Sequence, residues 1–215
     1  MKIGVFDSGI GGEAVARSIR VAFPEAPVVV VNDREHMPYG ERTQVEVQRL
    51  TNIAIQPLLE QQCNVIVIAC NTATAFAIEW LRKKYPSQRF IGLEPMVKPA
   101  SRITRTRVIV VCATPTTLAS ERYERLKNDF GQGATIIEPG CHDWARMIED
   151  NDINESKITD MVQQAKKHNA DVIVLACTHY HWIREQIEQR AGPTITVIDP
   201  SEAIVSRVGS LLRHA

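Results

Sequence analysis

The segment Asn64-Val-Ile-Val-Ile-Ala-Cys70 recurs as Asp171-Val-Ile-Val-Leu-Ala-Cys177, about 107 residues further along the 215-residue chain. Three landmarks that recur in the same order indicate an internal duplication. The sequence therefore predicts two similar halves, with a boundary near residues 96–106. The other two landmarks, both offset by about 105 residues, are Ile91-Gly-Leu-Glu-Pro95 with Thr196-Val-Ile-Asp-Pro200, and Lys2-Ile-Gly-Val-Phe6 with Arg107-Val-Ile-Val-Val111.

Short apolar runs bounded by turn residues alternate with helical patterns along the whole chain. This alternation predicts an α/β fold of mostly parallel sheets flanked by helices. Apolar residues recur at helical spacing over residues 44–62, with a bend expected at Pro57, and over residues 73–84, 156–168 and 183–190. The expected strands are residues 3–6, 28–31, 65–69, 90–93, 108–111, 135–137, 172–176 and 194–198.

A duplicated α/β unit predicts two similar lobes related by a pseudo-twofold axis. We expect an N-terminal lobe over residues 1–96, with residues 200–215 returning to it, and a C-terminal lobe over residues 97–199. Ligands of such folds bind at the carboxyl ends of the strands. The active site is therefore expected in the cleft between the lobes.

The charges of the chain balance, because 25 Lys and Arg side chains are matched by 25 Asp and Glu side chains. Proteins that bind nucleic acids or anionic membranes usually carry a basic excess, so neither partner is expected. No apolar run approaches the roughly 18 residues of a membrane span, and residues 1–6 resemble a strand rather than a signal peptide. We therefore expect a soluble, cytoplasmic protein. Five cysteines without a CxxC pair disfavour a disulfide framework and a zinc ribbon, and no bound metal is expected.

Two of the five cysteines, Cys70 and Cys177, end the duplicated strand, and each is followed by residues expected to cap a helix, Asn71-Thr72 and Thr178-His179 respectively. The positive end of a helix stabilises a thiolate. A single such cysteine is most simply a buried structural residue, but the duplication favours a function for the pair. Two thiols facing each other across one bound molecule could remove a proton and return it from the opposite face, which is acid–base catalysis with inversion.

Two further residues adjoin these strand ends. Asp7 ends the first strand and precedes glycines that allow close backbone approach to a ligand, so it could orient a proton or merely cap a helix. His179 lies two residues after Cys177, where it could act as an acid or base near neutral pH or be an exposed loop histidine. We favour the functional interpretation of His179 because of its neighbour.

In these features the chain resembles the glutamate racemase family. The resemblance implies a cofactor-independent enzyme that interconverts L- and D-glutamate and supplies D-glutamate for peptidoglycan synthesis. None of the expected strands ends in a lysine that could hold pyridoxal phosphate, which agrees with the absence of a cofactor. The matching motifs are Phe6-Asp-Ser-Gly-Ile-Gly-Gly12, Pro38-Tyr-Gly40, Ala69-Cys-Asn-Thr72, Glu94-Pro95, Thr114 to Thr117 with Ser120 and Tyr123, and Ala176-Cys-Thr-His-Tyr180.

The resemblance also implies roles for individual residues. Cys70 and Cys177 would be the two bases, Asp7 and His179 would assist them on their respective sides, and Glu149 would assist His179. A homodimer is a further expectation from the family. The amino acid would be held by Asp7, Ser8, Pro38, Tyr39, Gly40, Cys70, Asn71, Thr72, Thr114, Thr117, Cys177, Thr178 and His179.

Several alternatives stay open at the level of the sequence. His36, Thr116 and the stretch His142-Asp143-Trp144 depart from the family pattern, which leaves aspartate, or the substrate of a related cofactor-independent isomerase, as an alternative to glutamate. A non-catalytic amino-acid-binding protein would also fit altered loops. Dinucleotide binding is a rival from another class, because Gly9-Ile-Gly-Gly-Glu-Ala14 fits G-x-G-x-x-A and Asp33 follows the second strand. That interpretation leaves the duplicated cysteines unexplained.

Overall fold

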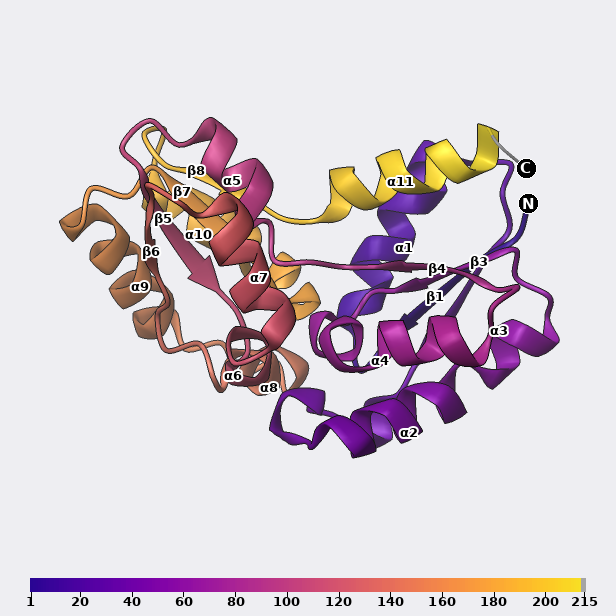
Figure 1. The fold of residues 1–215 in the computed structure, drawn as a ribbon. Helices are drawn as coiled ribbons and strands as arrows, with labels where there is room; N and C mark the ends of the chain where they lie inside the picture. Colours follow the sequence, from indigo (N-terminus) through magenta and orange to yellow (C-terminus); the bar gives the residue numbers. More distant parts are fainter. Residues whose placement is uncertain (214–215) are drawn as a thin grey trace. The chain divides into compact units, whose positions relative to one another are not determined.

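The structure is a computed structural model that describes residues 1–213 (Figure 1), and it divides into two compact units. One unit is Met1–Glu94 together with the chain from Pro200 on, and the other is Pro95–Asp199. Each unit contains one four-stranded sheet whose strands are all parallel. The predicted α/β class, with two parallel sheets flanked by helices, is confirmed. Residues 214 and 215, the end of the segment expected to return to the first lobe, lie outside the described residues.

The first unit orders its strands β2-β1-β3-β4. These strands are β1 (Ile3–Asp7), β2 (Val28–Asn32), β3 (Val65–Ile68) and β4 (Arg89–Gly92). Its helices are α1 (Gly11–Ala22), α2 (Gln44–Ala54), α3 (Gln56–Glu60), α4 (Asn71–Lys84) and α11 (Ser201–Arg213), with two 3-10 turns, η1 (Arg34–His36) and η2 (Tyr39–Glu41).

Both faces of this sheet are covered, which explains why its central strands, β1 and β3, are buried at every position. Side chains of a strand alternate between faces. Phe6, Ile66 and Ile68 pack with residues of α2, α3 and α4, while Val5 and Val67 pack on the other face with residues of α1 and α11. Figure 1 shows α1 and α11 side by side on that second face. The core therefore forms two layers, one on each side of β1 and β3.

The second unit repeats the strand order of the first, because its first strand also lies between its second and third strands. The strands are β5 (Val108–Cys112), β6 (Thr135–Ile137), β7 (Val172–Leu175) and β8 (Thr196–Ile198), in the order β6-β5-β7-β8. The helices are α5 (Val97–Ile103), α6 (Pro115–Leu118), α7 (Glu121–Phe130), α8 (Trp144–Glu149), α9 (Glu155–Lys167) and α10 (Arg184–Ala191), with the 3-10 helix η3 (Thr178–Ile183).

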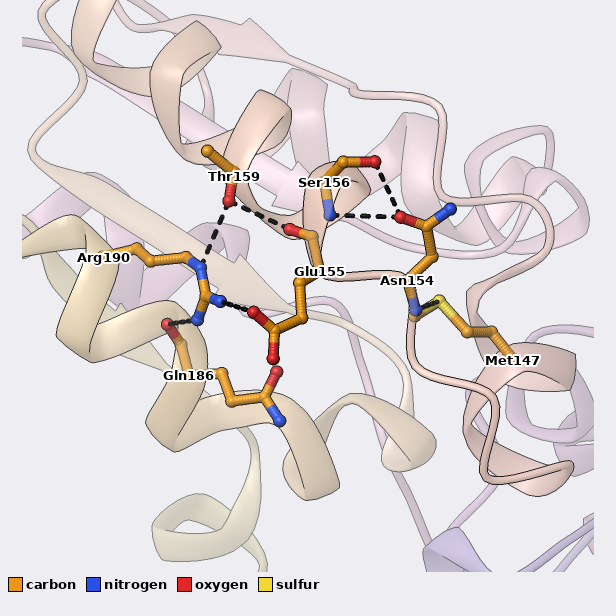
Figure 2. A network of polar contacts seen from close by, with 7 residues as sticks. All are labelled: Met147, Asn154, Glu155, Ser156, Thr159, Gln186 and Arg190. Carbon is orange, nitrogen blue, oxygen red and sulfur yellow. Dashed lines mark hydrogen bonds and ion pairs between the residues drawn. The ribbon is translucent and has the colours of Figure 1, made fainter.

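A guanidinium group fastens α10 to α9 (Figure 2). Arg190 of α10 donates to the Glu155 carboxylate at 2.8 Å, to the Thr159 hydroxyl at 3.2 Å and to the backbone oxygen of Gln186 at 3.0 Å. Glu155 begins α9 directly after Asn154, whose side chain caps that helix. The planar group satisfies three acceptors at once, which a lysine could not do in the same geometry.

All eight predicted strands are confirmed, with ends that differ by at most two residues. The prediction of one bent helix over residues 44–62 was wrong. The helix stops at Ala54, and α3 starts at Gln56 with Pro57 in its first turn, where the missing N–H of proline costs nothing. None of the described helices is both long and apolar enough to cross a membrane.

Candidate active site

The Cys70 thiol lies at the carboxyl edge of the first sheet, two residues beyond the end of β3. Its sulfur accepts a hydrogen bond from the backbone N–H of Ala73 at 3.4 Å, so Cys70 itself is the N-cap of α4. The expectation that Asn71 and Thr72 cap this helix was therefore wrong, since both belong to its first turn. A sulfur in the cap position receives the positive end of the helix directly, which favours the thiolate.

The end of β1 lies at the same edge as this thiol, because β1 and β3 pair in parallel with Phe6 opposite Ile68. The Ser8 hydroxyl donates to the Cys70 sulfur at 3.3 Å. The carboxylate of Asp7 is fully buried and accepts the backbone N–H of Gly9 at 2.8 Å. The N-cap residue of α1 is Ile10, which makes no side-chain cap hydrogen bond.

Gly12 explains how Asp7 fits in this place. A Cβ atom on Gly12 would lie 2.6 Å from the Asp7 Cβ and 3.0 Å from the Asn32 Oδ1. The backbone of α1 therefore approaches the end of β1 as closely as only glycine allows. This packing accounts for the glycine at position 12, which is one of the variable positions of the G-x-G-x-x-A pattern.

The Asn71 side chain is buried without hydrogen-bond partners. Its exposed fraction is 4%, and neither its amide nitrogen nor its amide oxygen has a partner within residues 1–213. Buried polar atoms are normally paired, so two such atoms on one side chain indicate a group that binds there. An amide offers both a donor and an acceptor, which suits a ligand that carries both kinds of group.

The loop after β2 brings Tyr39 close to the same thiol. Tyr39 is buried in the cluster that contains Phe6 and Cys70, and its phenol donates to the Asp33 Oδ2 at 2.6 Å. Burial, the Asp33 carboxylate and the nearby Cys70 thiol all raise the pKa of Tyr39. Pro38 precedes the turn η2, and Gly40 lies within it, so residues 38–40 form one short segment at this edge. Sequence reasoning missed Asp33, which it considered only for dinucleotide binding.

The Cys177 thiol occupies the equivalent place in the second unit, two residues beyond the end of β7. Its sulfur lies 3.8 Å from the Nδ1 of His179, and the Nε2 of His179 lies 3.0 Å from the Glu149 Oε2. The side chains of His179 and Glu149 are only 4% and 5% exposed. The residues that follow Cys177 form a 3-10 helix without a side-chain cap, so the expectation that they repeat the cap arrangement of Cys70 was wrong. The polar group next to the Cys177 sulfur is therefore the buried His179 ring, whereas the polar group next to the Cys70 sulfur is a helix N-terminus.

Hydroxyl groups line the same edge of the second sheet. Thr114 follows β5 and caps α6 by accepting the Thr117 backbone N–H at 3.3 Å, while the two hydroxyls lie 3.0 Å apart. Thr178 is buried at the start of η3, next to Cys177. Each unit thus holds a thiol, a polar side chain within hydrogen-bonding reach of it, and further polar side chains at one edge. No group of three His, Cys, Asp or Glu side chains in residues 1–213 is arranged to hold a metal ion.

The sequence and the fold of this chain are similar to those of known racemases. The model of the Asp/Glu/hydantoin racemase family matches residues 12–208. A glutamate racemase of Sulfurovum sp. is 38% identical over 98% of this chain and 82% of its own length. The crystal structure of Escherichia coli glutamate racemase with L-glutamate and an activator superposes with a TM-score of 0.89 at 26% identity, over 99% of this chain and 82% of that one. The glutamate racemase of Aquifex pyrophilus superposes with a TM-score of 0.79 at 32% identity, over 98% and 84% of the two chains.

Proposed function

Because the chain belongs to the Asp/Glu/hydantoin racemase family, we propose that it interconverts L- and D-glutamate without a cofactor, with Cys70 and Cys177 as the two bases. The observation that carries the proposal is the equivalence of the two thiols. Each is buried, each lies two residues beyond the third strand of its unit, and each contacts a side chain that can form a hydrogen bond with it. Racemisation needs two such groups, both of which must reach one bound amino acid.

Each thiol would alternate between two protonation states. When one thiolate removes the α-proton it becomes a thiol, and the other thiol donates its proton to the opposite face and becomes a thiolate. Ser8 and the N-terminus of α4 stabilise the charged form of Cys70. His179, held by Glu149, would exchange a proton with Cys177. Asp7 would assist on the Cys70 side.

The α-proton of an amino acid is very weakly acidic while its carboxylate is ionised. The protein must therefore stabilise the developing negative charge with fixed donors, each worth about 3 kcal/mol by the precedent of oxyanion holes. The unpartnered amide of Asn71 supports this role, because it could bind the ammonium group with its oxygen and the carboxylate with its nitrogen. The remaining proposed substrate contacts are Asp7, Ser8, Pro38, Tyr39, Gly40, Thr72, Thr114, Thr117, Thr178 and His179.

A glutamate racemase would supply D-glutamate for peptidoglycan synthesis, which is a cytoplasmic step. Relatives named as glutamate racemases support glutamate over aspartate as the substrate. A homodimer is proposed on the family resemblance, and light scattering after size-exclusion chromatography would test it.

The proposal is tested by incubating the protein with L-glutamate and, separately, L-aspartate in D₂O without any cofactor. Loss of the α-proton is followed by NMR, and inversion by circular dichroism. Glutamate should exchange its α-proton and racemise, whereas a binding protein without catalytic activity would do neither. Exchange with aspartate alone would assign the other substrate.

Single variants test the two bases. Cys70→Ala and Cys177→Ala should each abolish racemisation, while α-proton exchange can survive from one enantiomer in each. Cys63→Ala is the matched control, because Cys63 is an equally buried thiol whose pKa is raised by burial. Full activity in either of the first two variants would exclude the two-base assignment.

A further inference from the structure

One carboxylate organises the loop that carries the proposed substrate-binding segment 38–40. Asp33 lies just after β2, and its two oxygens hold two different side chains: Oδ2 accepts the Tyr39 phenol proton at 2.6 Å, and Oδ1 lies 2.8 Å from the Nδ1 of His36. The backbone N–H of Asp33 donates to the backbone oxygen of Asp7 at 3.0 Å. Asp33 is therefore fixed to the end of β1 on one side and to the loop on the other.

The loop is closed further along by Arg42, whose Nε donates to the backbone oxygen of His36 at 2.7 Å. Tyr39 is the buried member of this loop, with 1% of its surface exposed, and its ring packs against Phe6 at a centroid distance of 6.1 Å. Cys70 belongs to the same buried cluster. Burial and the Asp33 carboxylate are the main causes of the raised pKa of Tyr39, and the negative charge of Cys70 adds to them. The hydroxyl that Asp33 holds is therefore in the electrostatic range of one proposed base.

A phenol has one proton, and an ionised carboxylate can only accept. Once that proton is committed to Asp33, the Tyr39 oxygen has lone pairs left and no second proton to give. It can accept a hydrogen bond from a thiol or an ammonium group, but it cannot donate one to a thiolate or a carboxylate. Because the pKa of Tyr39 is raised, the phenol keeps its proton throughout the neutral range.

We propose that Asp33 is a positioning residue for the Cys70 half of the reaction, acting through Tyr39. It holds the segment 38–40 against the sheet edge and fixes the Tyr39 hydroxyl as an acceptor for proton donors on the Cys70 side, the thiol itself or the substrate ammonium group. This inference rests on the proposed racemase activity. Asp33 itself would contact neither the substrate nor the thiol. It would act on proton transfer at Cys70 only by fixing the direction of the Tyr39 hydroxyl.

The central variant is Asp33→Asn, which keeps the shape of the side chain. Asparagine carries no charge and keeps only one acceptor oxygen, so the phenol loses the charged acceptor that fixes its proton. We expect kcat/KM for glutamate to fall about tenfold or more, as for the loss of a hydrogen bond to a charged group. Tyr39→Phe removes the hydroxyl and should cause a loss of similar size. If Asp33 acts through Tyr39, the double variant is no worse than Tyr39→Phe alone.

Isotope effects separate positioning from general damage. The two enantiomers have equal free energies, so kcat/KM must fall equally in both directions. Slowing only the Cys70 step should raise the α-deuterium kinetic isotope effect for the enantiomer whose proton Cys70 removes and lower it for the other. A structural defect would reduce both rates and leave the two isotope effects unchanged.

The matched control is Tyr123→Phe. Tyr123 is buried in the second unit and donates its phenol to the Glu138 carboxylate at 2.9 Å, so the variant loses the same kind of bond in the unit that does not contain Cys70. It should lose comparable thermal stability and keep wild-type kinetics.

Unchanged kcat/KM in Asp33→Asn, additive losses in the double variant, or symmetric isotope effects would each overturn the inference while wild-type racemisation persists. Absence of racemisation in the wild-type protein would instead overturn the proposed function, and the inference with it. If Asp33→Asn does not fold, Tyr39→Phe alone still tests the asymmetry of the isotope effects.

Discussion

Gly12→Ala adds one methyl group at the most crowded point beside Asp7. The new Cβ would lie 2.6 Å from the Asp7 Cβ and 3.6 Å from the Asp7 Cγ. Carbon atoms pack best at about 3.5–4.0 Å, so the pair must separate by roughly 1 Å. The Asp7 Cβ cannot rotate out of the way, because it is bonded directly to the backbone of β1. The helix, the strand end or both must move.

Two opposing effects set the change in stability. Overpacking a well-packed site costs about 1–3 kcal/mol, whereas replacing a helical glycine by alanine gains up to about 1 kcal/mol. The expected net loss is therefore about 0–3 kcal/mol, which a folded domain tolerates. The effect on catalysis should be larger, because a displacement of about 1 Å in a reacting group can cost about 10²-fold. Gly12→Ala should be a folded protein with about 1% of the wild-type racemisation rate.

The assay compares urea unfolding with the rate of glutamate racemisation followed by circular dichroism. Gly140→Ala is the control, since a Cβ there meets no atom within 4 Å and the residue has no positive φ. It should keep the wild-type rate and change stability by no more than about 0.5 kcal/mol. A Gly12→Ala protein with the wild-type rate would refute the reasoning, because it would mean that the position of Asp7 does not matter for the reaction.

Three further variants test other contacts. Glu149→Gln removes the charge that holds the ring of His179. We expect kcat for glutamate to fall about tenfold or more, with KM nearly unchanged. An unaltered kcat would exclude Glu149 as a partner in proton exchange. Burial raises the pKa of the Asp171 carboxyl, but hydrogen bonds from residues 104–106 outweigh it and lower the pKa. Asp171→Asn should therefore lose about 2 kcal/mol at pH 7, and urea titrations of the two proteins should converge as the pH falls below about 3.9 towards the lowered value. Burial lowers the pKa of His181, so the unfolded chain binds a proton on this ring near pH 6.5 and the folded protein does so only at lower pH. Below about pH 6.5 the free energy of unfolding should therefore fall less in His181→Gln than in the wild type. Parallel profiles of the free energy of unfolding against pH would contradict this.

The strands were predictable because a parallel strand covered on both faces is apolar at every position. Val65–Ile68 and Val172–Leu175 illustrate this, since all eight residues are buried. Helix ends were harder, because they depend on caps that the periodicity does not encode. The thiol of Cys70 took the cap position that Asn71 was expected to fill, and the break at Ile55 required knowing how the chain turns before Pro57.

The site was predictable where its residues adjoin a strand end. Asp7, Cys70 and Cys177 were singled out by position and duplication alone. The partner of His179 is different, because Glu149 comes from another helix 30 residues away, and only the family resemblance pointed to it. The Asp33 network could not be predicted at all, since it depends on how the loop after β2 folds back on itself.

The two thiol environments differ chemically although the strands that carry them are duplicated. In the proposed reaction each thiol must serve in both protonation states, because the direction of racemisation decides which one starts ionised. The Ser8 hydroxyl can donate to the Cys70 thiolate or accept from its thiol by rotating, and the N-terminus of α4 biases it towards the thiolate. At Cys177 the same two states are served by a histidine ring that can donate or accept, oriented by a buried carboxylate. The duplicated strands thus place the two sulfurs in equivalent positions. In the proposed reaction each sulfur must also gain and lose a proton reversibly, and different residues serve that step in each unit.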